Sequence, residues 1–549
     1  MKKGIIIGAS IGNCVHVAGV AHFLNLAQEE GYETIFLGPA VDTAVIENAI
    51  RHYKPRYVAV GYRLTPENFI KIIPSYIEMN NRQENKPIWI FGGTYSVAKK
   101  AKETGLFDII FDSTEDIDEC IKFLRTGIHT KENENEHNSQ NVVQRIAQKR
   151  PYPLLRHHFG LPSYKETIEG ISQISKSKIL DVISLGIDQN TQQYFFRPDM
   201  RNKDMDGAGG VPVSSKEAFI TLKKASEYGN FPLMRCYSGT ADVLNFAEML
   251  VNTISNAWCA VPLCWYNEID GRGTRKLHIS IEEAQSLMRW HGERDIPVEL
   301  NEPHHWGLRD AHDTISVAMS YISAYNAKKN GVKDYIAQYM FNVPNGLTFS
   351  MDLAKVLAQL EMTESLATKE FRVYRQVRAG LPFLSSDADV AKGQLAASTQ
   401  LSMAIEPHII HVVGYSEAIE AASAQVVIES CKIVRGVIRS VLHGNIDYKQ
   451  DSAVQRRKKE LIDDATYLLN FIKHVYADKS KDPLSDSAVL TDCIKKGILD
   501  APHIFKNDEF RGVLHTRVYD GKCLAYDPKE RCFLNEKQRL FRLTGKEII

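Results

Sequence analysis

From residue 3 to about residue 124, short β-branched runs alternate with helical stretches, and this alternation constrains the fold more than any other feature of the sequence. Strands are predicted at residues 4–8, 33–37, 56–61, 87–91 and 108–111. Strands joined by helices pair in parallel, because each helix carries the chain back to the same edge of the sheet. The pattern predicts an α/β domain, a doubly wound parallel sheet of the flavodoxin (Rossmann-like) type, with ligands at the carboxyl ends of its strands.

The same alternation resumes on a larger scale after residue 151. Further strands are predicted at residues 179–186, 232–237, 258–265, 296–300, 335–341, 371–375 and 408–414. Amphipathic helices fall between them, for example at residues 243–256, 281–291, 310–330 and 391–405. Seven strand–helix units predict a (β/α)₈ TIM barrel in which one strand is not placed, with an active site on the face where the strands end.

These patterns divide the chain into four parts. The first domain covers residues 1–125, and residues 126–150 are expected to form a flexible linker, because residues 126–141 have almost no apolar side chains and no periodicity. The barrel covers residues 151–445. Residues 446–549, which include a charged helix at 454–477, are expected to form a C-terminal accessory region.

Composition excludes several classes of protein. The 549 residues include 67 basic and 67 acidic side chains, a balance that favours neither nucleic acid nor a membrane surface. No apolar run approaches the roughly 20 residues that span a bilayer, so we expect a cytoplasmic protein. The nine cysteines form no Cys-x-x-Cys pair, which argues against a disulfide scaffold or a zinc knuckle. Cys236, Cys259 and Cys264 lie within predicted strands and are expected in the core.

A short motif follows the first strand. Gly8, Gly12 and Gly19 do not have the spacing of a dinucleotide fingerprint. The segment Cys14-Val15-His16-Val17-Ala18-Gly19 instead resembles the Asp-x-His-x-x-Gly signature of the cobalamin-binding domain of methionine synthase and of the carbon-skeleton mutases and aminomutases. Gly61-Tyr-Arg-Leu-Thr65-Pro and Gly92-Gly93 stand where that family has comparable segments, and the resemblance covers about 120 residues.

The resemblance implies a cobalamin cofactor, with His16 as the axial ligand to cobalt and the nucleotide tail of the cofactor in a groove. The cofactor-binding residues that it predicts are Gly12, Asn13, Cys14, His16, Val17, Gly19, Gly61, Arg63, Thr65, Gly92 and Gly93. Cys14 replaces the usual aspartate, so the carboxylate that accepts the imidazole N–H is missing and Asn13 is an alternative acceptor. The alternative interpretation of His16 is a loop histidine in an ordinary flavodoxin-like domain.

Polar side chains also gather at the predicted strand ends of the barrel, where barrel enzymes keep their chemistry. The candidate catalytic residues are Arg235, Tyr237, Ser238, Tyr266, Glu268, Arg272, Glu302, His304, His411 and Tyr415. Arginines suit a substrate carboxylate because the guanidinium offers paired donors in a fixed fork. The alternative is that several of these side chains only bridge neighbouring loops.

The barrel resembles the large components of adenosylcobalamin-dependent glutamate mutase and of the lysine and ornithine aminomutases. The resemblance rests on residues 231–242, on the stretch from Trp265 to residue 283, and on residues 411–418. It implies an adenosylcobalamin-dependent radical isomerase, or mutase, that rearranges a small carboxylate or amino-acid substrate. We also expect a homodimer.

Other functions stay open at this point. An aminomutase would also use pyridoxal phosphate, a corrinoid methyltransferase would use cobalt differently, and a sensor would bind cobalamin without turnover.

Two further segments could be taken for binding sites but are better explained as loops. Residues 299–313 contain three histidines whose spacing matches no standard zinc pattern, and we expect them to line the pocket. The glycine-rich residues 206–212 could cradle a phosphate but are better explained as a tight loop.

Overall fold

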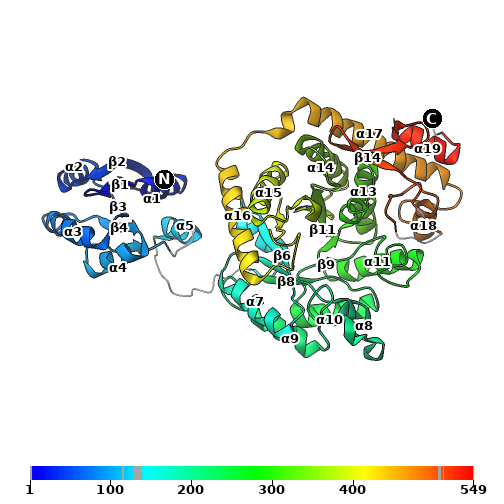
Figure 1. Ribbon diagram of the computed structural model, residues 1–549, viewed down its shortest axis with the longest axis horizontal. Coiled ribbons are helices and arrows are strands. Elements are labelled where there is room, and N and C mark those ends of the chain that lie inside the picture. The colour runs from blue at the N-terminus through cyan, green and yellow to red at the C-terminus, as the bar shows by residue number, and fades with distance from the viewer. Residues whose placement is uncertain (1–2, 114–116, 128–138, 505–508, 511, 548–549) are drawn as a thin grey trace. The chain divides into compact units, whose positions relative to one another are not determined.

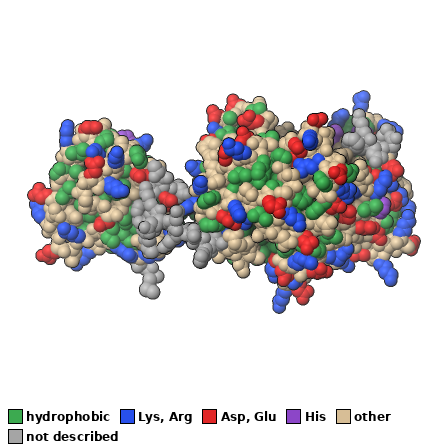
Figure 2. All heavy atoms as spheres, turned by 90° about the horizontal axis from the view of Figure 1, so that it is seen from below, with side chains coloured by type: hydrophobic (Ala, Val, Ile, Leu, Met, Phe, Trp, Pro, Cys, Tyr) green, Lys and Arg blue, Asp and Glu red, His purple; other side chains and the backbone are tan. Residues whose placement is uncertain are grey.

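The computed structural model describes residues 3–113, 117–127, 139–504, 509–510 and 512–547 (Figure 1). The chain divides after Glu134 into two compact units. Within the described residues, no helix is both long and apolar enough to cross a membrane. Acidic and basic side chains are interspersed on the visible face of each unit (Figure 2).

The first unit contains a five-stranded parallel sheet with the order β2-β1-β3-β4-β5. Its strands are β1 (Ile5–Ile11), β2 (Glu33–Val41), β3 (Tyr57–Tyr62), β4 (Ile88–Gly93) and β5 (Ile109–Phe111). Its helices are α1 (Ala18–Glu29), α2 (Thr43–Tyr53), α3 (Pro66–Asn81), α4 (Tyr95–Glu103) and α5 (Ile117–Thr126). This order confirms the predicted flavodoxin-type α/β fold, and it places the ends of β1, β3 and β4 side by side.

Two apolar layers hold this sheet. Helices α2, α3 and α4 pack on one face, with Ile46, Phe69 and Val97 among the buried contacts. Helices α1 and α5 cover the other face, where Leu24 and Phe123 are buried. Both faces of the sheet are therefore covered, which explains why its strands are apolar runs rather than alternating ones.

The second unit is a nearly closed eight-stranded parallel barrel, with the strand order β8-β7-β6-β13-β12-β11-β10-β9. A single bridge between Tyr237 and Ala260 links β8 to β9. The strands are β6 (Leu154–Phe159), β7 (Val182–Leu185), β8 (Leu233–Cys236), β9 (Cys259–Ala260), β10 (Val298–Leu300), β11 (Asp334–Phe341), β12 (Arg372–Ala379) and β13 (Ile409–His411). The predicted barrel is confirmed.

Helices surround the barrel strands (Figure 1). The outer ring consists of α7 (Tyr164–Lys176), α9 (Lys216–Ala225), α10 (Val243–Ile254), α11 (Leu277–Gly292), α13 (Asp313–Lys329), α14 (Phe349–Glu364), α15 (Ala388–Ser402) and α16 (Ala424–Leu442). Short helices α8 (Gln189–Tyr194) and α12 (Glu302–Gly307), with 3₁₀ turns at Pro198–Met200, Lys203–Met205, Leu381–Phe383 and Met403–Ile405, lie in the connections. Cys236, Cys259 and Cys264 are buried in this unit, as expected.

The strand that the sequence did not place is β6. It was missed because Arg156, His157 and His158 interrupt its apolar character. The structure buries Arg156 and His157 completely. Arg156 binds Ser184, Glu299 and Gln376 on other barrel strands, whereas His157 pairs with Glu417 in the connection that follows β13.

The predicted flexible linker at residues 126–150 needs a correction, because helix α6 (Val142–Lys149) lies within it. Val142 and Ile146 are buried against Leu154, Trp258 and Ile409, at the ends where the barrel strands begin. The helix therefore closes the bottom of the barrel. The polar composition of residues 126–141 concealed this short amphipathic segment, while residues 128–138 lie outside the described part of the chain.

The C-terminal region packs on the outside of the barrel. It contains α17 (Ser452–Val475), α18 (Ser487–Lys495), the antiparallel strands β14 (Thr516–Tyr519), β15 (Lys522–Asp527) and β16 (Cys532–Leu534), α19 (Glu536–Thr544) and a 3₁₀ turn at Tyr448–Gln450. Helix α17 lies against α13 and α14, and α18 lies against α11. Arg457 on α17 and Asp313 at the start of α13 form a buried ion pair of 2.9 Å.

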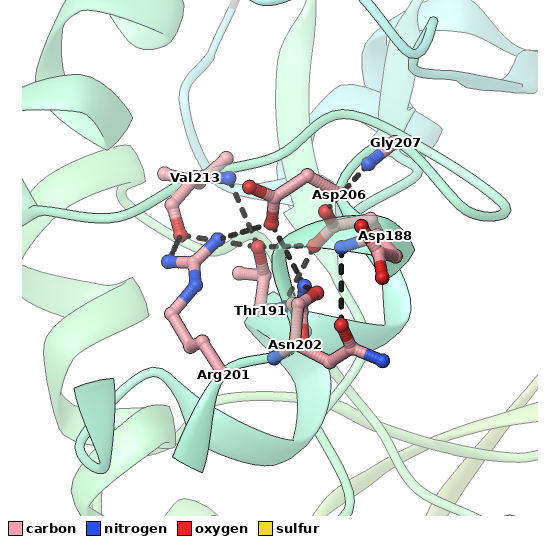
Figure 3. Close-up of polar contacts among 9 residues, drawn as sticks. Asp188, Thr191, Arg201, Asn202, Asp206, Gly207 and Val213 are labelled. Carbon is pink, nitrogen blue, oxygen red and sulfur yellow. Dashed lines mark hydrogen bonds and ion pairs between the residues drawn. The ribbon is translucent and has the colours of Figure 1, made fainter. Parts of the chain in front are cut away.

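The connection between β7 and α9 is braced from inside by Asp188 (Figure 3). Its carboxylate accepts hydrogen bonds from the backbone and hydroxyl of Thr191, at 2.8 and 2.6 Å, and from the backbone of Gly207 at 2.9 Å. Arg201 binds the carboxylate of Asp206 at 3.2 Å. The backbone N–H of Gly207 therefore already donates to a carboxylate of the same chain. This supports the interpretation of residues 206–212 as a tight loop and not as a phosphate cradle.

Asp188→Ala should lower the free energy of unfolding by about 2–4 kcal/mol, because three donors lose a buried acceptor and helix α8 loses its N-cap. Urea unfolding followed by tryptophan fluorescence measures the change. Asp199→Ala, at an exposed position in the same connection, is the matched control and should be close to neutral. Equal effects of the two substitutions would contradict the bracing role.

Candidate functional site

A cavity of about 410 Å³ opens at the carboxyl ends of β1, β3 and β4, between the sheet and helices α1 and α5. Its lining includes the exposed His16, backbone at several glycines and an apolar floor. The lining residues are His16, Ala18, Gly19, Val20, His22, Phe23, Leu26, Ala59, Val60, Gly61, Tyr62, Arg63, Ile90, Gly92, Gly93, Thr94, Phe111, Ser113 and Cys120. The position is the one that the doubly wound topology predicts for a ligand.

The glycines of this cavity have different roles. A Cβ at Gly61 would lie 2.6 Å from Val20, and one at Gly93 would lie 2.6 Å from the carbonyl oxygen of Tyr62. These two glycines are required by packing within the domain. A Cβ at Gly92 would meet nothing within 4 Å, so the absence of a side chain there keeps space free for a ligand.

Hydrogen bonds hold the loop that carries His16. Ser10 donates to the carbonyl oxygen of His16 at 2.7 Å. Cys14 is fully buried, and its sulfur lies 3.8 Å from Nδ1 of His16. The side-chain oxygen of Asn13 accepts from the hydroxyl of Tyr62 at 2.9 Å. Cys14, rather than the alternative Asn13, therefore lies beside the imidazole in this structure.

The other predicted cofactor-binding residues divide into two groups. Arg63 lines the cavity, whereas Gly12, Val17 and Thr65 are not part of its lining. Thr65 caps helix α3 by accepting from the backbone of Asn68, which is a structural role. Sequence reasoning missed His22, Phe23, Thr94, Phe111, Ser113 and Cys120. The helical spacing of residues 19, 22, 23 and 26 could have identified the α1 face of the cavity.

The centre of the barrel contains one carboxylate shared by two arginines. Oε2 of Glu299 lies 3.0 Å from Arg156 and 2.8 Å from Arg235, and it accepts from the indole of Trp258 at 2.6 Å. All four side chains are fully buried. Burial alone would raise the pKa of Glu299, but the two guanidiniums outweigh it and hold this pKa at about 2. Glu299 is therefore ionised at neutral pH.

Aromatic rings and histidines surround this cluster. The guanidinium of Arg235 lies 4.2 Å from the ring centre of Tyr237, and the ring of His158 stacks on that of Tyr237 with 5.3 Å between the ring centres. His411 lies 4.8 Å from His158. Burial and the neighbouring arginines lower the pKa of His158 and of His411 well below the usual value. These imidazoles are neutral at pH 7.

Several buried polar atoms in the described part of the barrel have no hydrogen-bond partner within the protein. They are Nε and Nη1 of Arg235, Oε1 of Glu299, both amide atoms of Asn301, Nδ1 of His304, Nε of Arg378 and Nδ1 of His411. Buried polar groups in native proteins are nearly always satisfied, so a group of exceptions at the strand ends needs an explanation. A polar ligand in the barrel would supply the missing partners.

The structure gives two predicted catalytic carboxylates other partners. Oε1 of Glu302 accepts from the backbone of Leu263 and Cys264 at 2.6 and 3.0 Å, and its Oε2 accepts from Trp306 at 2.9 Å. Glu268 binds Lys276 at 2.8 Å and caps the next helix at Leu277. We therefore assign both glutamates a structural role, in agreement with the alternative that such residues bridge loops.

Three of the remaining candidates have contacts outside the central cluster. The hydroxyl of Tyr415 donates to Glu429 at 2.6 Å, which together with burial raises the pKa of Tyr415 to about 12. Arg272 is exposed and stacks on Tyr266 at 5.1 Å. Ser238 is buried and donates to the carbonyl oxygen of Gly239 at 3.5 Å. Of the predicted set, Arg235, Tyr237, His304 and His411 lie around the central cluster.

Arg156, His158 and Glu299 are central residues that sequence reasoning missed. Arg156 and His158 belong to the strand that was not placed, and Glu299 lay inside a predicted strand as an apparent exception to its apolar pattern. A charged residue in the middle of a predicted barrel strand is the signal that could have found them, because such a side chain must be paired or functional.

The side chains of the histidine-rich residues 299–313 are not gathered around one point. Among the described residues, no three His, Cys, Asp or Glu side chains are grouped so as to hold a metal ion. His312 pairs with Glu536 at 2.9 Å, and Asp313 pairs with Arg457. His304 and His305 lie on α12, which directly follows the end of β10, and their lining of a pocket stays a prediction.

A comparison with protein families supports the predicted resemblance of the first unit to a cobalamin-binding domain. Residues 4–121 match the family described as the B12 binding domain. The first unit is a B12-binding domain, a larger barrel domain follows it, and cobalamin is the cofactor. The exposed imidazole of His16 at the rim and the open space at Gly92 fit such a ligand.

No curated protein matches the chain. Among solved structures, it is similar to the apo, selenomethionine-labelled cobalamin-dependent S-adenosylmethionine radical enzyme OxsB. The TM-score is 0.19 and the identity is 8%, over 90% of this chain and 71% of that chain. A similarity at this level indicates neither a shared fold nor a shared reaction.

Gly92→Leu should weaken cobalamin binding about tenfold or more, because the new side chain would occupy the open part of the cavity. The free energy of unfolding should change by less than about 1 kcal/mol, since no protein atom lies within 4 Å of the new Cβ and the rest of the side chain can extend into the cavity. A cobalamin titration followed by visible absorbance measures the affinity. Gly393→Leu on α15, also at an open position, is the control, and unchanged binding by Gly92→Leu would contradict the cavity assignment.

The buried barrel histidines predict a loss of stability in mild acid. Burial lowers the folded-state pKa of His158, His304, His305 and His411 well below 6.5, whereas the unfolded chain binds protons near pH 6.5. Each therefore destabilises the fold as the pH falls below 6.5, by up to about 1.4 kcal/mol per pH unit.

Urea unfolding between pH 7.5 and 5.5 tests this dependence. His304→Gln should remove the contribution of one histidine and reduce the slope of unfolding free energy against pH. His474→Gln, at an exposed position on α17, should leave the slope unchanged. A slope that His304→Gln does not alter would mean that His304 is accessible to protons in the folded state.

Proposed function

We propose that this protein is an adenosylcobalamin-dependent radical isomerase that rearranges a small carboxylate substrate inside the barrel. The observation that carries the proposal is the group of unpartnered buried donors around Arg235 and Arg378, in a barrel joined to a B12-binding domain. When bound, adenosylcobalamin would supply a carbon radical through homolysis of its cobalt–carbon bond.

The charge of the barrel centre favours an anion. Oε2 of Glu299 binds Arg156 and Arg235, and the guanidinium of Arg378 lies near enough to Arg156 to lower its pKa. A second carboxylate, of Glu417, has its pKa lowered in part by Arg378, so three guanidiniums face two carboxylates. Burial and the neighbouring Arg235 lower the pKa of Arg156 only to about 10, so this arginine stays charged at neutral pH. Because the nearby histidines are neutral, the cluster carries excess positive charge. A substrate with one or two carboxylates would balance it.

Different side chains of the barrel centre would bind different groups of the substrate. Arg235 and Arg378 would hold a substrate carboxylate, since both have N–H donors without partners. Oε1 of Glu299 accepts hydrogen bonds and would bind a substrate amino or hydroxyl group. Nδ1 of His304 and Nδ1 of His411 can accept or donate one hydrogen bond each. The buried position of these groups would also keep water away from a reactive radical.

The same charge weighs against a lysine or ornithine aminomutase, whose substrates carry additional positive charge. That reaction, with pyridoxal phosphate as a second cofactor, is therefore the weaker proposal. A corrinoid methyltransferase and a sensor without turnover are outcomes of the experiment below. The expected homodimer stays a prediction, and light scattering of the purified protein would check it.

The proposal is tested with the full-length protein loaded with adenosylcobalamin. Small mono- and dicarboxylic acids, with and without amino groups, are added singly, and the visible spectrum is followed for cob(II)alamin. A substrate should also take up tritium from cofactor labelled at the adenosyl 5′ carbon. Methyl transfer from methylcobalamin, with no such exchange, would replace the proposal by a methyltransferase. Binding without any turnover would indicate a sensor.

Arg378→Lys should raise the KM or the dissociation constant of the acid substrate about tenfold or more, because an ammonium cannot reproduce the paired donors. Cobalamin affinity should not change. Arg372→Lys, at the opposite end of the same strand β12, is the matched control. An equal loss of substrate and cobalamin binding by Arg378→Lys would point to a folding defect.

A further inference from the structure

The axial-ligand motif of this chain has a cysteine where related motifs have an aspartate. Cys14 is fully buried, and two nitrogens lie near its sulfur. The backbone N–H of Arg63 donates to Sγ at 3.4 Å, and Nδ1 of His16 lies 3.8 Å from it. Both distances are within the range of hydrogen bonds to sulfur. The sulfur therefore occupies the place of the missing carboxylate.

The position of this sulfur is determined by the backbone around it. The backbone N–H of Cys14 donates to the carbonyl oxygen of Ile11 at 3.1 Å, and the carbonyl oxygen of Cys14 accepts from the backbone N–H of Ala40 at 2.9 Å. The side chain belongs to the apolar core between the sheet and helices α2 to α4. A thiol turned toward solvent would lose this apolar packing and the hydrogen bond from the backbone of Arg63, so the observed position beside the imidazole is favoured.

The orientation of the imidazole follows from this contact. Because Nδ1 faces the sulfur, Nε2 is the ring nitrogen that is available to a metal. An imidazole that ligates through Nε2 carries its proton on Nδ1 and needs an acceptor there. The strength of that acceptor controls how basic the ligating nitrogen is, and partners of this kind change metal affinity by about 10- to 100-fold.

We propose that Cys14 is the positioning residue of the axial histidine, and that its sulfur, a weaker acceptor than a carboxylate, makes the bond between His16 and cobalt weaker than an aspartate would. The proposal rests on ligation of cobalt by His16. A weaker axial bond makes the cobalt easier to reduce, since less electron density reaches it from below.

The experiment uses the full-length protein with cob(II)alamin and electron paramagnetic resonance. Coupling to one axial nitrogen gives a triplet splitting, and protein labelled with ¹⁵N-histidine should give a doublet if a protein imidazole is the ligand. His16→Ala should abolish the effect of the label. If wild-type protein labelled with ¹⁵N-histidine still gives a triplet, or gives no nitrogen splitting, His16 is not the ligand. The basis of the proposal would then be overturned, independently of Cys14.

Variants at position 14 test the sulfur itself. Cys14→Asp should bind cob(II)alamin about tenfold more tightly and shift the cobalt(II/I) potential to a more negative value, whereas Cys14→Ala should bind about tenfold more weakly and show partial loss of the histidine coupling. Cys14→Ser, which retains a weak acceptor, should lie near the wild type. Cys532→Ala in the C-terminal sheet is the matched control.

Thermal unfolding identifies variants that do not fold. If the buried carboxylate of Cys14→Asp prevents folding, Cys14→Ala and Cys14→Ser decide the question. Folded Cys14→Ala with the affinity, nitrogen coupling and potential of the wild type would overturn the proposal. Loss of affinity in Cys14→Ala with restoration in Cys14→Ser supports it, because a purely structural role of the thiol would not alter the nitrogen coupling.

Discussion

The carboxylate of Glu299 is the interaction on which the barrel centre depends. A single oxygen, Oε2, partly neutralises the charges of the buried Arg156 and Arg235 and accepts a hydrogen bond from the indole of Trp258. An uncompensated guanidinium in such a place would cost several kcal/mol. The arrangement lets β6, β8 and β10 each direct a charged side chain inward. It also leaves the second oxygen of Glu299 and two nitrogens of Arg235 without partners, so the same cluster that stabilises the barrel is poised to bind a polar molecule.

The candidate sites of the two units differ in their physical character. The B12-binding domain makes space by omitting side chains, and Gly92 shows this most clearly. The centre of the barrel instead contains buried charged side chains, Arg156, Arg235 and Glu299. A large, preformed cofactor suits an open groove with an apolar floor, whereas a small substrate is recognised by a few fixed donors and acceptors in a site without water.

Much of the fold was predictable from the sequence because the alternation of strands and helices is local and regular. The cavity glycines and His16 were predictable because they belong to a short contiguous motif. The strand that contains Arg156 and the pairing of Glu299 were not, since nothing in a sequence shows which charged residues will meet across a barrel. Glu302 illustrates the converse: a carboxylate at a strand end looked catalytic, but one of its oxygens accepts from the backbone of a neighbouring loop and the other from the indole of Trp306.

Helix α6 has a consequence for how the chain can be divided. The helix belongs to the barrel, because Val142 and Ile146 cover the apolar ends where the strands begin. A barrel produced as a separate polypeptide from residue 151 onward would expose Leu154, Trp258 and Ile409 to water and would be prone to aggregate. Any natural or engineered separation of the two halves into independent subunits must therefore cut the chain before the cap of α6 at Asn141.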